Sequence, residues 1–336
     1  MSIRAFAAVL VLSAGGCSSL LTETPPEGDD SETPLEGLTP EELATFAAGD
    51  ETFERQFSAA DGLGPTFNQV SCGACHVGDG AGHPDNVLVR YSRAGDPLFG
   101  LGGPQLQDRA IPGVEPEALP PNVQTSRRVP PVVHGMGLIE AIPAAAILAN
   151  ADPDDDDEDG ISGRPNCIAL FPPADPSIPV IAELIASSAE VCDEGLVVGR
   201  FGWKANNATL EGQVATAYQQ DMGITNPLLP TEPNSAAFAG AVPGDLVADP
   251  EIETDDLQLT TAYVRMLAPP RSEANDEDVA QGSALFDELG CASCHIRELR
   301  TSSDSPVAAI RDRAVPLYSD LLLHDMGQEL ADARVD

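Results

Sequence analysis

The sequence predicts a mainly α-helical fold in which two similar units are joined by long irregular segments. Apolar residues at helical spacing precede each of two Cys-x-x-Cys-His motifs, and no segment alternates with the period of two that indicates a series of strands. The 30 prolines and 30 glycines also break the chain between short helices. With 336 residues, 42% of them hydrophobic, the chain is long enough for two domains with real cores.

The surface is strongly acidic. Acidic residues outnumber basic ones 54 to 17, which gives a formal net charge of −37. Phosphate backbones and anionic lipid surfaces repel such a charge, so we expect no nucleic-acid partner. A basic protein partner is compatible with this surface, and a simply solvated acidic surface is the alternative.

Residues 1–16 have the features of a signal peptide. Arg4 supplies one positive charge, and the apolar run Ala5–Leu12 and several small residues follow it. This run is too short to span a bilayer, and no later stretch has about 18 consecutive apolar residues. The sequence therefore predicts export without a membrane-spanning helix.

The end of this signal resembles a bacterial lipobox, because Ser13-Ala-Gly-Gly precedes Cys17. The resemblance implies a lipid anchor at Cys17, and Ser18 favours the periplasmic side of the outer membrane. Ordinary cleavage that leaves Cys17 as an odd thiol is the alternative. Residues 17–38 are rich in Pro, Thr and acidic side chains, so we expect them to form a tether.

Two close cysteine pairs are each followed at once by histidine: Cys72, Cys75 and His76, and then Cys291, Cys294 and His295. This arrangement is the attachment signature of haem c, in which two thiols bond to the vinyl groups and the histidine binds the iron. Zinc would need two more ligands at each site. The sequence therefore predicts two covalently attached haem groups.

The chain ahead of each motif fits a cytochrome c-like domain. Apolar residues at helical spacing run from Asp276 to Leu289, where Gly290 ends the pattern. Ahead of the first motif, Thr39-Pro-Glu-Glu42 is typical of a capping box at a helix start. We expect an N-terminal haem c domain with insertions over residues 39–249 and a cytochrome c domain over residues 250–336.

Four further helices are predicted between the motifs, over Pro143–Asn150, Val180–Ala189, Asn207–Met222 and Thr254–Leu267. Proline in the first turn and glycine after the last turn favour these limits. In contrast, Gly100–Pro121 is too polar and too often broken by Pro and Gly for regular elements.

Two cysteines, Cys167 and Cys192, belong to neither motif. In an oxidising compartment a structural disulfide accounts for them, and two buried free thiols are the alternative.

The acidic run 152–160 is a candidate calcium loop. Asp155, Asp157 and Asp159, followed by a glycine, fit the first half of an EF-type loop, although Asn166 stands where a bidentate Glu is needed. A solvated acidic loop is the alternative.

Five segments resemble the bacterial di-haem oxidoreductase family, also called thiol oxidoreductase-like proteins: Pro130–Pro143, Asp159–Asn166, Gly199–Ala205, Asp221–Asn226 and Leu321–Gly327. The resemblance covers nearly everything after Leu38. It implies a peroxidase-like redox enzyme that passes electrons between two haems, and an electron-donor protein or small redox molecule as partner. Family members usually continue further after the second motif than the 41 residues here (336 minus 295), so a shortened C-terminal domain is expected.

A wider resemblance links the family to di-haem cytochrome c peroxidases and implies catalytic roles for Trp203, Gln213 and Asp221. In those enzymes the Trp lies between the haems, and a Gln and a Glu serve the peroxide pocket. Asp221 replaces that Glu, and its distance of eight residues from Gln213 is shorter than usual. Independently, Gln213, Ala217 and Asp221 share one helix face. For Trp203, a core or haem-packing position is the alternative.

The sixth ligand of each iron decides between catalysis and electron transfer. We expect Met326 at the second haem and either His134 or Met136 at the first, with a core Met or a capping His as the alternative. Arg127 and Arg128 could neutralise haem propionates or lie on the surface. If both irons have two strong ligands, the protein is an electron-transfer cytochrome without catalytic activity.

Overall fold

The computed structural model describes residues 32–80, 82, 84–98, 101–156, 158–171, 177, 179–233, 244–270, 276–331 and 334. The predicted signal peptide, Cys17 and most of the predicted tether lie outside these residues. None of the described helices is long and apolar enough to span a membrane.

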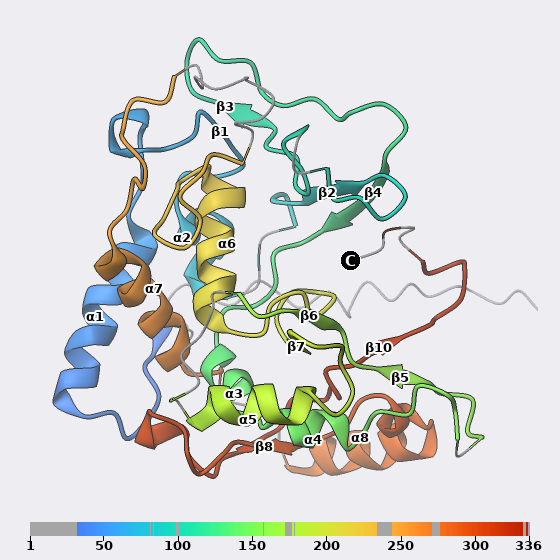
Figure 1. Cartoon of the computed structure of the whole chain (residues 1–336). Helices are drawn as coiled ribbons and strands as arrows, with labels where there is room; N and C mark the ends of the chain where they lie inside the picture. The colour runs from blue at the N-terminus through green and yellow to red at the C-terminus, as the bar shows by residue number, and fades with distance from the viewer. Residues whose placement is uncertain are drawn as a thin grey trace, which may run out of the picture.

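The prediction of a mainly α fold is wrong. Within the described residues, helix accounts for 33% and strand for 14% (Figure 1). The strands form five two-stranded antiparallel ladders, which pair β1 with β3, β2 with β4, β5 with β10, β6 with β7 and β8 with β9. Each strand has only two to five residues, so it satisfies backbone groups locally without a readable period of two.

The strand bounds are Thr66–Phe67 (β1), Leu88–Ser92 (β2), Arg109–Ala110 (β3), Gln124–Arg128 (β4), Gly163–Arg164 (β5), Cys167–Ala169 (β6), Leu196–Val198 (β7), Leu299–Arg300 (β8), Ala314–Val315 (β9) and Leu323–His324 (β10). The α-helices are Pro40–Glu54 (α1), Cys72–Cys75 (α2), Met136–Glu140 (α3), Ala144–Leu148 (α4), Pro179–Ser188 (α5), Leu210–Met222 (α6), Thr254–Met266 (α7) and Asp276–Glu288 (α8). Single 3-10 turns cover Ala59–Asp61, Val77–Asp79, Cys291–Ser293 and Ala308–Ile310.

The predicted helix limits are confirmed to within three residues at each end, because their caps form as the sequence indicates. Thr39 Oγ1 accepts from the Glu42 backbone N–H at 3.2 Å, and Glu42 Oε2 accepts from the Thr39 N–H at 2.7 Å, which is the predicted capping box of α1. At the end of α6, Gly223 takes the left-handed conformation with φ +67°.

Helices α1, α6 and α7 make the core that carries the site, and α1 lies against α7 (Figure 1). The ring of Tyr263 on α7 lies 4.7 Å from Phe46 and 5.2 Å from Phe53 of α1. Between them Gly49 approaches α7 so closely that a Cβ would lie 2.3 Å from the Leu259 carbonyl oxygen. Only glycine permits this approach, which brings α7 near enough to support α6.

A half-buried ion pair fixes the start of α6. The carboxylate of Glu140, at the end of α3, accepts from Arg265 Nε of α7 at 2.6 Å and from the Leu210 backbone N–H at 2.9 Å. Burial opposes ionisation of Glu140, but Arg265 holds its pKa below the ordinary value. One carboxylate thus joins three helices and anchors the first turn of α6.

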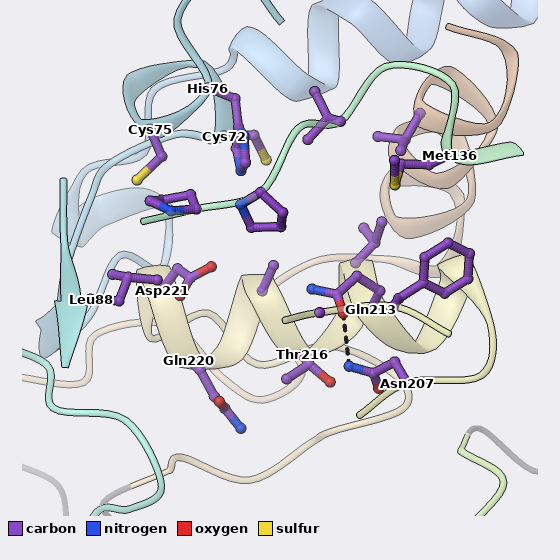
Figure 2. A pocket seen from close by; sticks show the side chains of 18 of the residues that line it. Cys72, Cys75, His76, Leu88, Met136, Asn207, Gln213, Thr216, Gln220 and Asp221 are labelled. Carbon is purple, nitrogen blue, oxygen red and sulfur yellow. Dashed lines mark hydrogen bonds between the residues drawn. The ribbon is translucent and has the colours of Figure 1, made fainter. Parts of the chain in front are cut away.

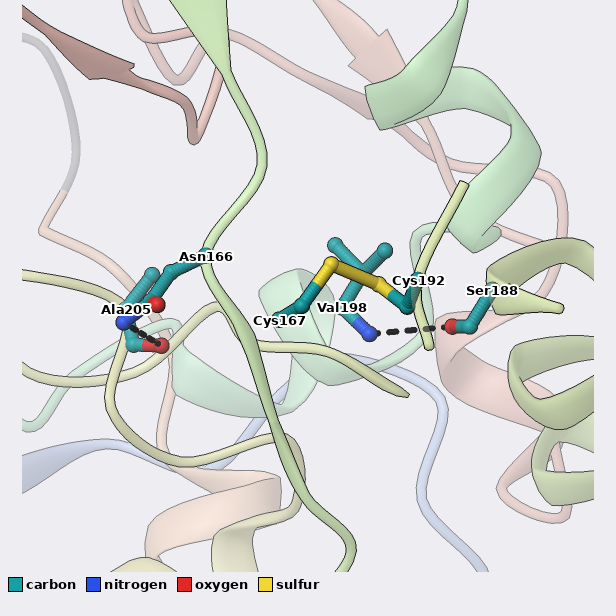
Figure 3. Close-up of a disulfide and its surroundings, with 6 residues drawn as sticks. All are labelled: Asn166, Cys167, Ser188, Cys192, Val198 and Ala205. Atoms are coloured by element: carbon teal, nitrogen blue, oxygen red, sulfur yellow. Dashed lines mark hydrogen bonds between the residues drawn. A yellow bond between two sulfur atoms is a disulfide. The ribbon is translucent and has the colours of Figure 1, made fainter. Parts of the chain in front are cut away.

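The predicted disulfide between Cys167 and Cys192 is confirmed (Figure 3). It ties β6 to the chain just after α5, with 5.6 Å between the two Cα atoms and a sequence separation of 25. Beside it, Ser188 Oγ accepts from the Val198 backbone N–H at 2.9 Å. Closure of a loop of this length contributes roughly 3 kcal/mol by the chain-entropy estimate.

Candidate functional site

A cavity of about 310 Å³ lies between the first Cys-x-x-Cys-His motif and helix α6 (Figure 2). This volume lies in the range of about 300 to 1,000 Å³ that is usual for small-molecule sites. The motif, the Pro-rich segment 129–133 and one face of α6 form most of its lining. The walls are therefore largely apolar, and most of the polar side chains come from α6 and β2–β4.

The first motif is a single helical turn, α2, with both thiols at the cavity. Ser71 Oγ caps this turn by accepting from the Ala74 backbone N–H at 3.1 Å. Cys72 and Cys75 are free, and burial raises both thiol pKa values, that of Cys75 to about 12. A redox or zinc-binding pair needs thiolates with lowered pKa values. These thiols instead stay protonated near neutral pH, which fits thioether formation with haem.

His76 has the protonation state that an iron ligand requires. Burial lowers its pKa to about 4, so the imidazole is neutral. Its Nδ1 is buried and has no hydrogen-bond partner within the part of the chain that the structure describes. Buried polar atoms normally have a partner. A neutral histidine with an unsatisfied nitrogen beside two free thiols fits the attachment of haem at this motif.

The shared face of α6 is confirmed, because Gln213, Ala217 and Asp221 all line the cavity opposite the motif. Asn207 Nδ2 donates to Gln213 Oε1 at 2.8 Å, and the amide nitrogen of Gln213 points into the cavity (Figure 2). A fixed amide of this kind can donate to an oxygen-containing ligand.

Asp221 is a half-buried carboxyl with one strong partner. Gln105 Nε2 donates to its Oδ1 at 2.5 Å. Burial raises the pKa of Asp221 to about 6, although the Gln105 bond and the charge of Arg90 act in the opposite direction. A carboxyl that titrates near neutral pH is suited to proton transfer.

Sequence reasoning missed Gln105, because it lies in the segment Gly100–Pro121 that was expected to be irregular. It is 3% exposed and also donates to Asn68 Oδ1 at 2.9 Å. Gln107 is equally buried and donates to the Gln219 and Gln220 carbonyl oxygens at 3.1 Å each. The alternation of Gln105, Leu106 and Gln107 ahead of β3 is typical of an extended stretch, but it would turn Leu106 and not the two glutamines inward, so it does not identify Gln105 as a site residue.

Trp203 lies at the rim of the cavity and not in the core. Its side chain is 61% exposed, and its Nε1–H donates to the Val129 carbonyl oxygen at 2.6 Å. The core position considered from the sequence is therefore wrong. The bond holds the Pro-rich wall of the cavity in place.

The structure brings only some of the other residues predicted near the first haem, two arginines and two possible iron ligands, to the cavity. Arg128 is buried at the cavity, whereas its neighbour Arg127 is exposed, as alternation along β4 requires. Met136, in the first turn of α3, lines the cavity, and His134 lies outside its lining. Arg200 is also buried and lines the cavity, so the first site has two buried arginines and one methionine in position to meet a ligand.

The second motif is more open. Cys291 and Cys294 are free and partly exposed, at the turn Cys291–Ser293 that follows α8. His295 is exposed, with Nδ1 3.0 Å from the Tyr318 carbonyl oxygen, a contact that orients the ring. The Phe286 ring packs edge-on against both His295 and Tyr318, at 6.3 and 5.4 Å.

A family model described as "di-haem oxidoreductase, putative peroxidase" matches residues 11–101 and 113–336. The chain belongs to this family. Neither a search of curated proteins nor a search of solved structures found a match. The resemblance predicted from the five segments is thus confirmed, and haem is the cofactor that the family name indicates.

For a di-haem oxidoreductase, the two motifs offer matched donor sets in different surroundings. Each has two free thiols and a histidine, so the residues fit one haem apiece. The apolar side chains that predict α8 remain accessible, since Val279 is 48%, Leu285 49% and Leu289 75% exposed. Met326, expected at the second iron, is 64% exposed, so a core position for it is excluded.

The acidic loop of this di-haem oxidoreductase is closed by its own backbone. Asp155 Oδ1 accepts from the Gly160 N–H at 3.0 Å, and Asp159 Oδ1 accepts from the Ile161 N–H at 2.8 Å. Asp157 lies outside the described residues. Calcium binding at this loop stays a prediction.

Proposed function

We propose that the protein is an exported di-haem c-type cytochrome that acts as a peroxidase-like oxidoreductase, with the oxidant reacting at the first motif. The observation that carries this proposal is the cavity that sets Asp221 and Gln213 opposite Cys72–His76. The second motif has no comparable acid and amide pair among its described contacts. We therefore assign it to electron entry.

The cysteines would hold two haems by thioether bonds, with His76 and His295 as iron ligands. Haem c supplies an iron centre that exchanges single electrons. Arg128, buried at the cavity, offers positive charge for a propionate. The apolar segment 129–133 limits the access of water to the same space.

Reduction of hydrogen peroxide to two water molecules takes two electrons and two protons, and the donor must supply the electrons one at a time. Asp221 is suited to move the protons at its carboxylate, because with a pKa of about 6 it can accept and release them near neutral pH. Gln105 keeps the carboxylate in place, and Gln213 would orient the peroxide oxygen through its amide N–H.

Electrons would come from an electron-donor protein or a small redox molecule. The net charge of −37 favours a basic donor, whose encounter with the protein would weaken as salt increases. Trp203, at the rim of the first site, is the aromatic group that we assign to electron passage between the haems.

Electron transfer without catalysis is the second candidate, and one observation favours it. Met136 lines the first cavity, and a thioether sulfur is a typical sixth ligand of electron-transfer haem. A bound Met136 would close the site to peroxide.

Electronic and EPR spectra of the purified protein, taken with and without peroxide, distinguish the two functions. The enzyme is expected to change its spectrum at one haem and to oxidise a reduced donor in a peroxide-dependent manner. In Trp203→Phe the resting spectra should persist while donor oxidation slows. Two low-spin haems that ignore peroxide would instead establish the electron carrier.

Export and lipid anchoring are part of the proposal, and the disulfide supports them because such bonds persist in oxidising compartments. We expect the wild-type protein in the outer-membrane fraction and the Cys17→Ser variant in the soluble periplasmic fraction. Fractionation followed by N-terminal mass analysis checks this. A soluble wild-type protein that begins at another residue would contradict anchoring at Cys17.

A further inference from the structure

Three carboxylates converge in the segment that connects α6 to α7. Glu232, Asp249 and Glu251 each place one oxygen atom within 4.8 Å of the others. They come from two stretches, one shortly after α6 and one just before α7. None forms a salt bridge with a basic side chain in the described part of the chain.

Glu232 is the unusual member of this cluster. Its side chain is only 5% exposed, and neither carboxylate oxygen has a hydrogen-bond partner among the described residues. A buried carboxylate without a partner is strongly unfavourable. Burial raises the pKa of Glu232 to about 9, and the charges of Glu251, Asp249 and Asp245 act in the same direction. The described protein groups therefore do not offset the free-energy cost of burying the Glu232 carboxylate.

The other two carboxylates are already held in position. The Thr225 backbone N–H and Oγ1 donate to Glu251 Oε2 at 2.7 and 3.2 Å, and Oγ1 also lies 2.6 Å from Asp249 Oδ1. The Thr225 carbonyl oxygen accepts from the Glu251 and Ile252 backbone N–H groups at 3.2 and 3.3 Å. These bonds arrange Asp249 and Glu251 around a point that Glu232 also faces, and they leave Glu232 for another partner.

We propose that Glu232, Asp249 and Glu251 bind a calcium ion. The donors are all hard carboxylate oxygens, with no histidine or cysteine among them, which disfavours zinc and copper. The three oxygen atoms lie within 4.8 Å of one another, so one cation can contact all three. Calcium accepts several carboxylate ligands in a flexible arrangement, whereas magnesium usually keeps several water molecules and binds only one or two carboxylates. This site is separate from the acidic loop 152–160.

Calcium there would tie the two ends of the connection together beside Thr225, which lies four residues beyond Asp221 and bonds both Asp249 and Glu251. It would neutralise the three carboxylates and hold the chain that leaves α6 against the chain that enters α7. The ion would thus stabilise the end of α6 that carries the proposed proton-transfer group, without touching the haem cavity.

Calorimetric titration of the chelator-treated, haem-loaded protein with Ca²⁺ tests the proposal. We expect a strong site in the wild-type protein whose Ca²⁺ affinity is weakened on the order of 100-fold in Glu232→Gln, since loss of even an indirect partner costs about 10- to 100-fold. Asp249→Asn should behave similarly if Glu232→Gln does not fold. The matched control is Asp159→Asn, which removes an exposed carboxylate of the acidic loop and should leave this affinity unchanged.

Thermal unfolding provides an independent readout. In chelator, Glu232→Gln should unfold at a temperature equal to or above that of the wild-type protein, because it loses an uncompensated buried acid. In Ca²⁺ the order should reverse, because only the wild-type protein gains stability from binding. The proposal is overturned if the wild-type protein binds no Ca²⁺, because shared protons and not a cation then neutralise the three carboxylates. It is also overturned if Asp159→Asn abolishes Ca²⁺ binding and Glu232→Gln does not.

Discussion

An Asp221→Asn variant is expected to lose roughly 100-fold or more of its peroxide-dependent turnover while keeping both haems. The substitution preserves size and can still accept the hydrogen bond from Gln105, but it removes the proton acceptor. Steady-state oxidation of a reduced donor, together with the haem spectrum, measures the effect. Glu211→Gln is the matched control, because it removes a carboxylate from the same helix outside the cavity lining and should leave turnover unchanged.

The pH dependence of turnover should show whether Asp221→Asn loses activity through the missing proton acceptor or through misfolding. Burial raises the pKa of Asp221 from 3.8 to about 6, so the wild-type rate should fall as the pH drops through about 6 and the acceptor becomes protonated. The Asp221→Asn variant should lack this decrease in rate.

The stability of the folded protein should depend on the same group. Because the folded state holds the Asp221 proton more tightly than the unfolded state, the stability contribution of Asp221 is present at low pH and lost as the pH rises from about 4 to about 6. Asp221→Asn should therefore be no less stable than wild type at pH 7 to 8, and full activity in it would remove Asp221 from the mechanism.

Replacement of both Cys72 and Cys75 by alanine is expected to reduce the haem content from two to one and to abolish the reaction with peroxide. Without the thiols the haem of the first site has no covalent attachment, while the second motif is unchanged. A haemochrome assay and the intact mass give the count after expression with a cytochrome c maturation system.

A second variant that also lacks two cysteines, but not those of a haem motif, serves as the control for this experiment. Cys167→Ala with Cys192→Ala removes the disulfide and should retain two haems, although its stability falls. Cys291→Ala with Cys294→Ala should retain the haem of the first site only. A Cys72 and Cys75 double variant that still carries two haems would show that covalent attachment at this motif is wrong.

Features that depend on local chemistry were predictable from the sequence. The helix limits follow from caps, prolines and Gly223, and the common face of Gln213 and Asp221 follows from the period of one helix. The disulfide followed from the number of cysteines and the expected compartment. Each of these inferences needs only neighbouring residues or a count.

Features that depend on contacts between distant segments were not predictable. Gln105 and Asp221 are hydrogen-bonded although they are 116 positions apart in the sequence, and no local pattern around either residue predicts this contact. The ladders that made the mainly α prediction wrong involve strands of two to five residues, too short for a period to appear. Likewise, Glu232 joins Asp249 and Glu251 only because Thr225 holds the returning chain.

The exposed position of Trp203 makes the first site optically distinct. It is the only tryptophan in the chain, so the long-wavelength part of the intrinsic fluorescence comes from one place, the rim of the cavity. Haem absorbs in the region where tryptophan emits, and a haem at the first motif would quench that emission by energy transfer. The intensity would then report occupancy of the first site in real time, with no label and with the second haem present throughout.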